Sequence, residues 1–137
     1  MRFKLIMQLE ISNNKTIGDV QQEFNNQYPF LKLEFYKREN LAPPIRVKDS
    51  LPNFTLLKSA GLKSSGYIDI NDNMIVAELE KLFFEQFGLI AQVSRNSGGV
   101  WLETKMTDNW SLYKQNEYGK EIIKHSGQNF FGNKRDD

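Results

Sequence analysis

The segment "NDNMIVAELEKLFFEQFG", residues 71–88, decides the predicted fold because it repeats the pattern of an earlier segment, "SNNKTIGDVQQEFNNQYP", residues 12–29. A shift of 59 residues superimposes the apolar positions, so that Ile17, Val20, Phe24 and Tyr28 align with Val76, Leu79, Phe83 and Phe87. Side chains three or four residues apart share one face of a helix. Both segments are therefore predicted to be amphipathic helices. They end at Pro29 and Gly88, because proline cannot continue a helix and glycine readily ends one.

Segments of alternating apolar and polar residues flank both helices and predict strands. "RFKLIMQLEI" and "GYIDI" precede the helices, and "FLKLEFYK" and "LIAQVSR" follow them. At a shift of 56 residues, "NFTLLK" matches "NWSLYK", which predicts that Phe54 is equivalent to Trp110 and that both are substantially buried. The sequence "NSGG", residues 96–99, predicts a hairpin turn between two strands.

These patterns predict an α+β fold made of two tandem repeats, each with the order strand, helix, strand, strand and short helix. Repeat one spans residues 2–61 and repeat two spans residues 66–119. A unit of roughly 55 residues is marginal alone and gains stability by sharing a core, so we expect one sheet of about six strands with the helices on one face. Residues 1–119 then form a single domain, and the polar residues 120–137 form a flexible tail.

Short motifs of the sequence resemble those of two families. "KTIGDV" and "MIVAEL", which follow predicted strands, resemble those of β-grasp, ubiquitin-like units, but ten residues before Ile11 leave no room for the opening hairpin of that family. The motifs "TIGDVQQEF", "VAELEKLF" and "VWLET…DNW" look more like a group of short uncharacterised bacterial proteins. That second resemblance spans most of the chain and implies no activity.

The composition argues against most catalytic chemistry. The absence of cysteine excludes disulfides, a thiolate nucleophile and Cys-ligated zinc, and the single histidine, His125, lies in the polar tail. The segment "DINDNMIVAELE", residues 69–80, has the spacing of a calcium loop, but Met74 stands where that loop needs glycine. We therefore expect no catalytic residue, no metal, no cofactor and no enzymatic activity.

Charge and hydropathy limit the partners. The chain start alternates instead of forming a signal segment, and no run approaches a membrane span, so we expect a soluble cytoplasmic protein without a membrane partner. Residues 1–66 hold ten Lys and Arg against six Asp and Glu, whereas residues 67–137 hold eight against eleven. This asymmetry favours docking of the two halves, self-association, or an anionic partner on the first half.

The leading hypothesis is a non-catalytic interaction or scaffold module that binds another protein or a second copy of itself. Strand alternation predicts that Val100 and Leu102 point inward and that Trp101 stands on the outer face. Tryptophan and arginine are enriched in binding hot spots, which favours Trp101 as a contact residue. The alternative is that its indole merely covers its own sheet. The candidate partner-binding residues are Tyr36, Arg95, Trp101, Glu103, Lys105 and Phe84, the last from the wide apolar face of the second helix.

Binding of RNA or single-stranded DNA is the alternative function. Basic residues interleaved with Tyr36 and Trp101 on the outer sheet face would neutralise phosphates and stack with bases. The candidate residues of this face are Arg2, Lys4, Lys32, Tyr36, Arg46 and Lys48. Glu10, Glu34 and Glu103 share that face and weigh against the alternative. A third class, an enzyme that uses only Asp, Glu, Lys and Tyr, has no supporting motif.

Overall fold

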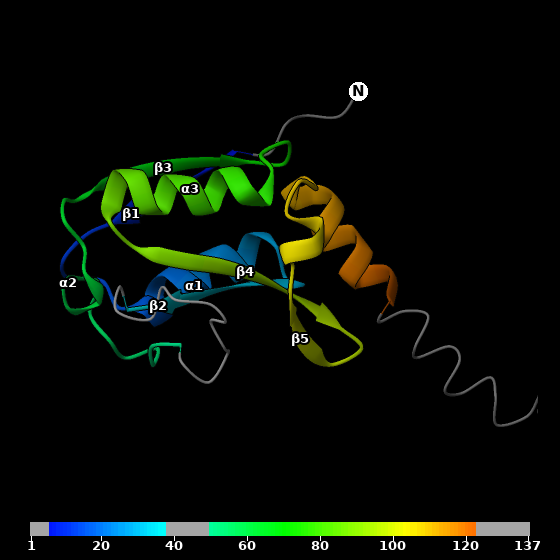
Figure 1. Ribbon diagram of the computed structural model, residues 1–137, viewed down its shortest axis with the longest axis horizontal. Helices are drawn as coiled ribbons and strands as arrows, with labels where there is room; N and C mark the ends of the chain where they lie inside the picture. Colours follow the sequence, from blue (N-terminus) through cyan, green and yellow to red (C-terminus); the bar gives the residue numbers. More distant parts are fainter. Residues whose placement is uncertain (1–5, 38–49, 123–137) are drawn as a thin grey trace, which may run out of the picture.

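The computed structural model describes residues 6–37 and 50–122 (Figure 1). The strands are β1 (Ile6–Ile11), β2 (Leu31–Tyr36), β3 (Gly66–Asn71), β4 (Ile90–Ser97) and β5 (Val100–Glu103). The helices are α1 (Ile17–Gln27), α2 (Leu57–Ala60), α3 (Val76–Phe87) and the 3-10 turn η3 (Lys105–Thr107), and a last helix covers residues 112–122. Both long helices predicted from the apolar stripes are confirmed.

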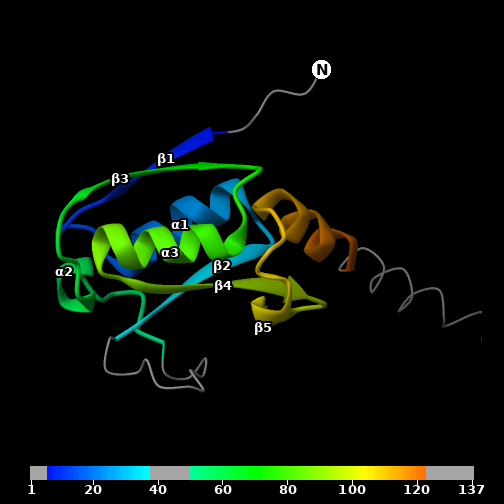
Figure 2. The same cartoon turned by 45° about the horizontal axis from the view of Figure 1, so that its top comes forward.

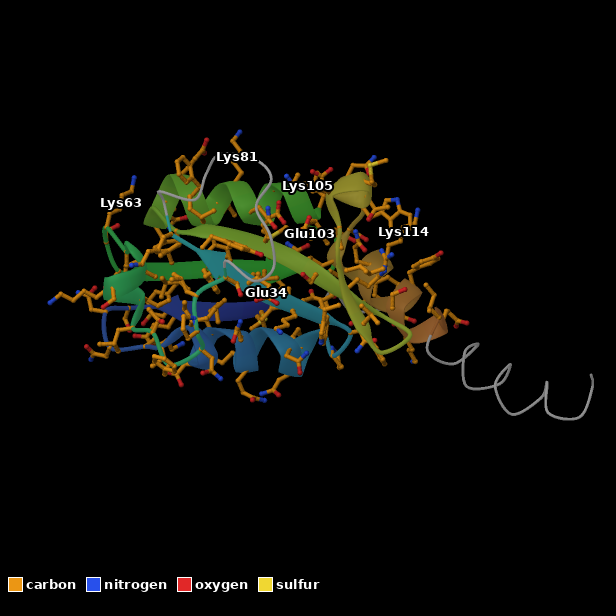
Figure 3. The ribbon with its side chains drawn as sticks, turned by 60° about the horizontal axis from the view of Figure 1, so that its bottom comes forward. Glu34, Lys63, Lys81, Glu103, Lys105 and Lys114 are labelled. Carbon is orange, nitrogen blue, oxygen red and sulfur yellow. The ribbon has the colours of Figure 1, made fainter. Side chains whose placement is uncertain are left out.

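The described strands form two antiparallel sheets, β1-β3 and β2-β4-β5. Figure 2 shows α1 and α3 between the two sheets, and Figure 3, seen from another side, shows α3 along one flank and α1 along the other. Two sheets and two helices thus form four walls around one core. The α+β class is confirmed, whereas the prediction of a single sheet of about six strands with helices on one face is wrong.

The sheets differ from the prediction because strands joined through a helix do not pair with each other. β1 pairs with β3, which sets Leu9 opposite Ile68, and β2 pairs with β4, which sets Leu33 opposite Val93. All four of these side chains are buried, so alternation identified the inward faces correctly. Neither half forms a sheet of its own, so the sheets do not show the predicted tandem repeats. The third strand predicted for the first repeat would fall in residues 38–49, which lie outside the described residues.

Corresponding backbone contacts hold the starts of α1 and α3. The N–H of Ile17 donates to the Thr55 carbonyl at 2.8 Å, and the N–H of Val76 donates to the Trp110 carbonyl at 3.1 Å. Thr55 is therefore the counterpart of Trp110, one residue away from the predicted match. The prediction for Phe54 is wrong in both respects, since this side chain is 77% exposed. The correspondence between the two halves is therefore set by these backbone hydrogen bonds, which the similarity of the two sequence segments does not specify.

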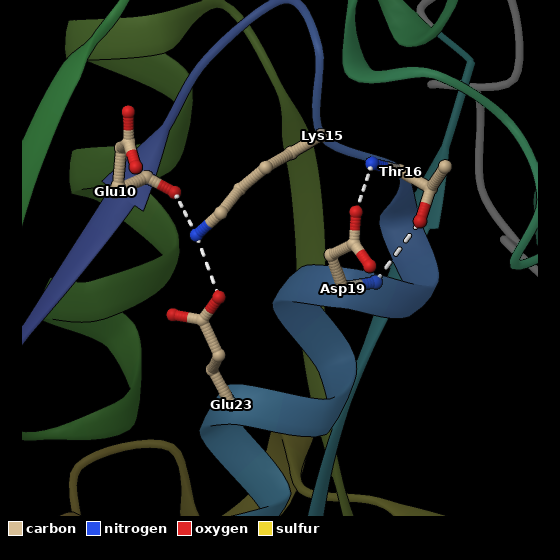
Figure 4. A network of polar contacts seen from close by, with 5 residues as sticks. All are labelled: Glu10, Lys15, Thr16, Asp19 and Glu23. Atoms are coloured by element: carbon tan, nitrogen blue, oxygen red, sulfur yellow. Dashed lines mark hydrogen bonds and ion pairs between the residues drawn. The ribbon is translucent and has the colours of Figure 1, made fainter.

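Side chains cap the first turn of α1 (Figure 4). The Thr16 hydroxyl accepts the N–H of Asp19 at 3.0 Å, and the Asp19 carboxylate accepts the N–H of Thr16 at 2.9 Å. These hydrogen bonds hold the pKa of the Asp19 carboxyl below its usual value, and the bond from the Thr16 backbone contributes the most. The Lys15 ammonium donates to the Glu10 carbonyl at 2.8 Å and to the Glu23 carboxylate at 2.7 Å, and so joins β1 to α1.

The helix over residues 112–122 packs on the ends of β2 and β4. The Asn116 side chain accepts the N–H of Phe30 at 2.8 Å. Gly119 lies so close to this surface that an added Cβ would stand 3.0 Å from the Asn96 carbonyl oxygen and 3.1 Å from Arg95 Cγ. The helix passes the predicted domain end at residue 119 by three residues, and the remainder of the predicted tail is outside the described residues.

We expect Gly119→Ala to lower the free energy of unfolding by about 1–3 kcal/mol, because the added methyl group forces the packed helix away from β4. Chemical denaturation measures this loss, with Lys120→Ala as the control because Lys120 is exposed on the same helix. An unchanged stability of Gly119→Ala would show that the helix does not pack closely here.

Candidate binding site at strand β5

The β4–β5 hairpin projects from the body of the molecule (Figure 1). Its turn contains Gly98 and Gly99, whose φ angles of 65° and 93° lie in the left-handed region that favours glycine. The Asn96 side chain accepts the N–H of Gly99 at 2.9 Å. The predicted hairpin is therefore confirmed. In the described part of the chain, β5 pairs only with β4, so it is the edge strand of its sheet.

The apolar side chains of β5 are exposed. Val100 is 58% and Leu102 is 46% exposed, so the prediction that both point into the core is wrong. Leu102 pairs with Arg95, on the face that carries Leu31 in β2, so alternation assigned the face correctly. The hairpin extends beyond the region that the core fills, and this face of β5 therefore meets solvent.

Trp101 is partly buried and lies on the opposite face, at the wall of a surface hollow. This Trp101 hollow has a volume of about 290 Å³ and is lined by Gly18, Gln21, Gln22, Asn25, Lys32, Asn53 and Trp101. The Lys32 ammonium stands 5.6 Å from the centre of the Trp101 ring. It also pairs at 3.1 Å with the carboxylate of Glu34, which is buried. The site therefore joins α1 and β2 to β5, which is distant from both in sequence.

Amide side chains of α1 form the other wall of the hollow and bond to the edge of β2. Gln21 Nε2 donates to the Leu33 carbonyl at 2.7 Å, and Asn25 Nδ2 donates to the Leu31 carbonyl at 3.0 Å. Sequence reasoning did not select these residues. A signal was present, because Gln21 and Asn25 are four residues apart and lie together beside the apolar stripe.

The other predicted partner-binding residues lie apart from the Trp101 hollow. Arg95 Nη1 donates to Gln115 Oε1 at 2.7 Å, and its guanidinium stands 4.8 Å from the centre of the Tyr118 ring. These contacts hold the last helix. Glu103 and Lys105 are exposed at the end of β5 and the start of η3 (Figure 3), and Phe84 is exposed on α3.

The predicted nucleic-acid face keeps only one of its two aromatic residues accessible, because Trp101 is partly exposed and Tyr36 is buried. Tyr36 is only 1% exposed, so the prediction that it offers a stacking surface is wrong. Both faces of β2 are largely covered, and strand alternation alone did not reveal this. The positive charge of Lys32 is balanced by the carboxylate of Glu34. Four further basic residues of this face lie outside the described residues: Arg2, Lys4, Arg46 and Lys48.

Glu80, on α3, is a partly buried acid that sequence reasoning did not select. Its carboxylate accepts the N–H of Val93 at 2.9 Å, while the Thr104 hydroxyl donates to the Val93 carbonyl at 2.9 Å. Burial raises the pKa of Glu80 to about 7; the Val93 hydrogen bond opposes this shift, and the neighbouring Asp108 carboxylate adds to it.

A carboxyl group with a pKa near neutrality suits acid–base catalysis, but Glu80 does not line the Trp101 hollow. Its bond to Val93 instead joins α3 to β4 next to the start of the hairpin pairing. We therefore assign Glu80 a structural role.

Metal ligation and membrane insertion have no support in the described residues. No three His, Cys, Asp or Glu side chains within residues 6–37 and 50–122 are grouped to hold a metal ion. Among the helices of that same part of the chain, none has the length and apolar character needed to cross a bilayer. The chain matches no family model, no curated protein and no solved structure. Its function must therefore be argued from the geometry of its surfaces.

Proposed function

We propose that the protein is a non-catalytic interaction module that binds another protein through the edge strand β5. The exposure of Val100 and Leu102 on a strand edge that pairs with no further strand within residues 6–37 and 50–122 supports this most directly. Neighbouring exposed apolar side chains are typical of interaction sites, and an open strand edge accepts an extended segment of a partner.

The hydrogen bonds of β4 indicate which backbone groups of β5 remain free. Both polar backbone groups of Val93 bond to side chains on the β5 side, whereas the N–H of Asn96 donates to the Phe30 carbonyl on the β2 side. Backbone directions alternate along a strand, so Arg95 faces its partner Leu102. The N–H and C=O groups of Trp101 and Glu103 therefore point away from β4, where a partner strand would pair.

Nucleic-acid binding has less support. Stacking needs an exposed aromatic beside uncompensated basic residues. Tyr36 is buried, and Lys32, the lysine beside the partly exposed Trp101, has its charge balanced by Glu34. A salt titration with mixed oligonucleotides separates the two functions, since binding that weakens steeply between low and physiological salt would favour nucleic acid over a protein partner.

The double variant Val100→Glu/Leu102→Glu tests the proposal. Two carboxylates at the centre of the interface must be desolvated on binding, so we expect the captured partner to bind at least about tenfold more weakly, while the fold is kept because both side chains are exposed. Capture from the native cell identifies the partner, and titration of the purified pair measures the change.

Tyr67→Glu is the matched control, because Tyr67 is an exposed side chain of β3 in the other sheet. We expect this variant to bind the partner as the parent does. Equal binding of the partner by the parent and the β5 double variant, or the absence of any captured partner, would contradict the proposal.

A further inference from the structure

The Trp101 hollow offers hydrogen-bond acceptors in excess. The side-chain nitrogens of Gln21 and Asn25 are committed to carbonyls of residues 29–33, and Gln22 Nε2 donates to Asn26 Oδ1 at 2.9 Å. The oxygens of these three lining amides accept no hydrogen bond from residues 6–37 or 50–122. A ligand on this wall can therefore donate to these oxygens, and it can accept from the second N–H of Gln21 or Gln22, because each of these nitrogens makes only one hydrogen bond within the described residues.

The charge of the hollow favours a neutral ligand. Among the described residues that line the hollow, only Lys32 has a charged side chain, and its ammonium is paired with the Glu34 carboxylate at 3.1 Å. A second cation against the Trp101 ring would meet this ammonium, which stands 5.6 Å from the ring centre. An anion would meet the amide oxygens and a lysine whose charge is already balanced.

The indole of Trp101 supplies an apolar wall beside these polar groups. An aromatic face carries partial negative charge and attracts polarised C–H groups, such as those on one face of a sugar ring. The volume of about 290 Å³ lies at the small end of the range for ligand pockets and suits one ring. A sugar ring also carries hydroxyl groups, which donate to amide oxygens and accept from lysine.

We propose that the Trp101 hollow binds a neutral saccharide, with one sugar ring stacked on Trp101 and its hydroxyl groups bonded to the amides of α1. This site shares Trp101 with the proposed protein interface, which uses the backbone of this residue, whereas the site uses its indole. It uses the opposite face of β5 from Val100 and Leu102.

Titration followed by NMR tests this site. The probes are three neutral trisaccharides, maltotriose, cellotriose and N,N′,N″-triacetylchitotriose, together with N-acetyl-arginine amide as a cation and inorganic phosphate as an anion. Each of the two tryptophans, Trp101 and Trp110, gives an indole N–H signal. We expect at least one trisaccharide to shift the Trp101 signal saturably at millimolar concentration and to leave Trp110 unchanged, and we expect neither charged probe to do so.

Two variants make the result specific. Trp101→Ala, followed through the side-chain amide signals of Gln21 and Asn25, should weaken saccharide binding at least about tenfold. Val100→Glu/Leu102→Glu should bind the saccharide as the parent does, so that failure of this site and failure of the protein interface are distinguishable. The proposal is overturned if no trisaccharide shifts Trp101 at 10 mM, on the order of a tenfold excess over a millimolar dissociation constant, if a charged probe binds in preference, or if Trp101→Ala binds equally well.

Discussion

Replacing Phe83 with alanine is expected to lower the free energy of unfolding by about 3–5 kcal/mol. Phe83 is fully buried on α3, and its ring meets that of Phe35 edge to face, with centroids 5.5 Å apart. Truncation removes this aromatic contact and leaves a cavity where α3 and β2 both face the core. Denaturation in urea, followed by circular dichroism, measures the loss.

Phe84→Ala is the matched control, because Phe84 is the next residue of α3 and is 41% exposed. The same chemical change should here cost about 1 kcal/mol or less. If the two variants unfold at the same denaturant concentration, the orientation of α3 in this account is wrong.

Replacing Glu80 with glutamine is expected to stabilise the protein above pH 7 by up to about 3 kcal/mol. Burial raises the pKa of the Glu80 carboxyl to about 7, from a usual value of 4.5. The folded parent therefore holds its proton more tightly than the unfolded chain does. The stability contributed by the neutral carboxyl is complete below pH 4.5, falls as the pH rises towards 7, and is lost above it. A glutamine oxygen still accepts the N–H of Val93 and never ionises.

The measurement is the free energy of unfolding of the parent and of Glu80→Gln between pH 4 and pH 8.5, which spans roughly the shifted and unshifted pKa values. The difference between the two proteins should grow across this range in favour of the variant. Glu78→Gln, at an exposed position one turn from the start of the same helix, should show no such growth. A pH-independent difference between parent and Glu80→Gln would show that the Glu80 carboxyl titrates normally.

The helices and the inward faces of the strands follow directly from the sequence, because both depend on local periodicity. The stripe from Val76 to Phe87 predicts α3, and alternation places Leu33 and Val93 inward. The pairing of strands depends instead on contacts between distant segments, and the same inward faces are compatible with one sheet or with two. Alternation also does not show where the core ends, which explains the unexpected exposure of Leu102.

The candidate site was predictable only in part. Trp101 could be selected from the sequence because it is a large aromatic residue in a short strand. Gln21 and Asn25, which line the same hollow, come from a helix some eighty residues earlier, and no local sequence pattern links them to Trp101. Glu80 was missed for a related reason. It lies beside the apolar stripe of α3, where a polar residue is ordinarily solvated, and only the position of Val93 shows that it is partly buried and bonded.

The central claim is that β5 is the protein-binding edge, and mapping the captured partner onto the isotope-labelled protein by NMR tests it most directly. The account predicts that the largest changes in backbone amide signals occur in Val100 to Glu103, with the amides of Trp101 and Glu103 gaining protection from hydrogen exchange as a partner strand pairs with them. Changes concentrated on the exposed face of α3 around Phe84, with β5 unaffected, would contradict it.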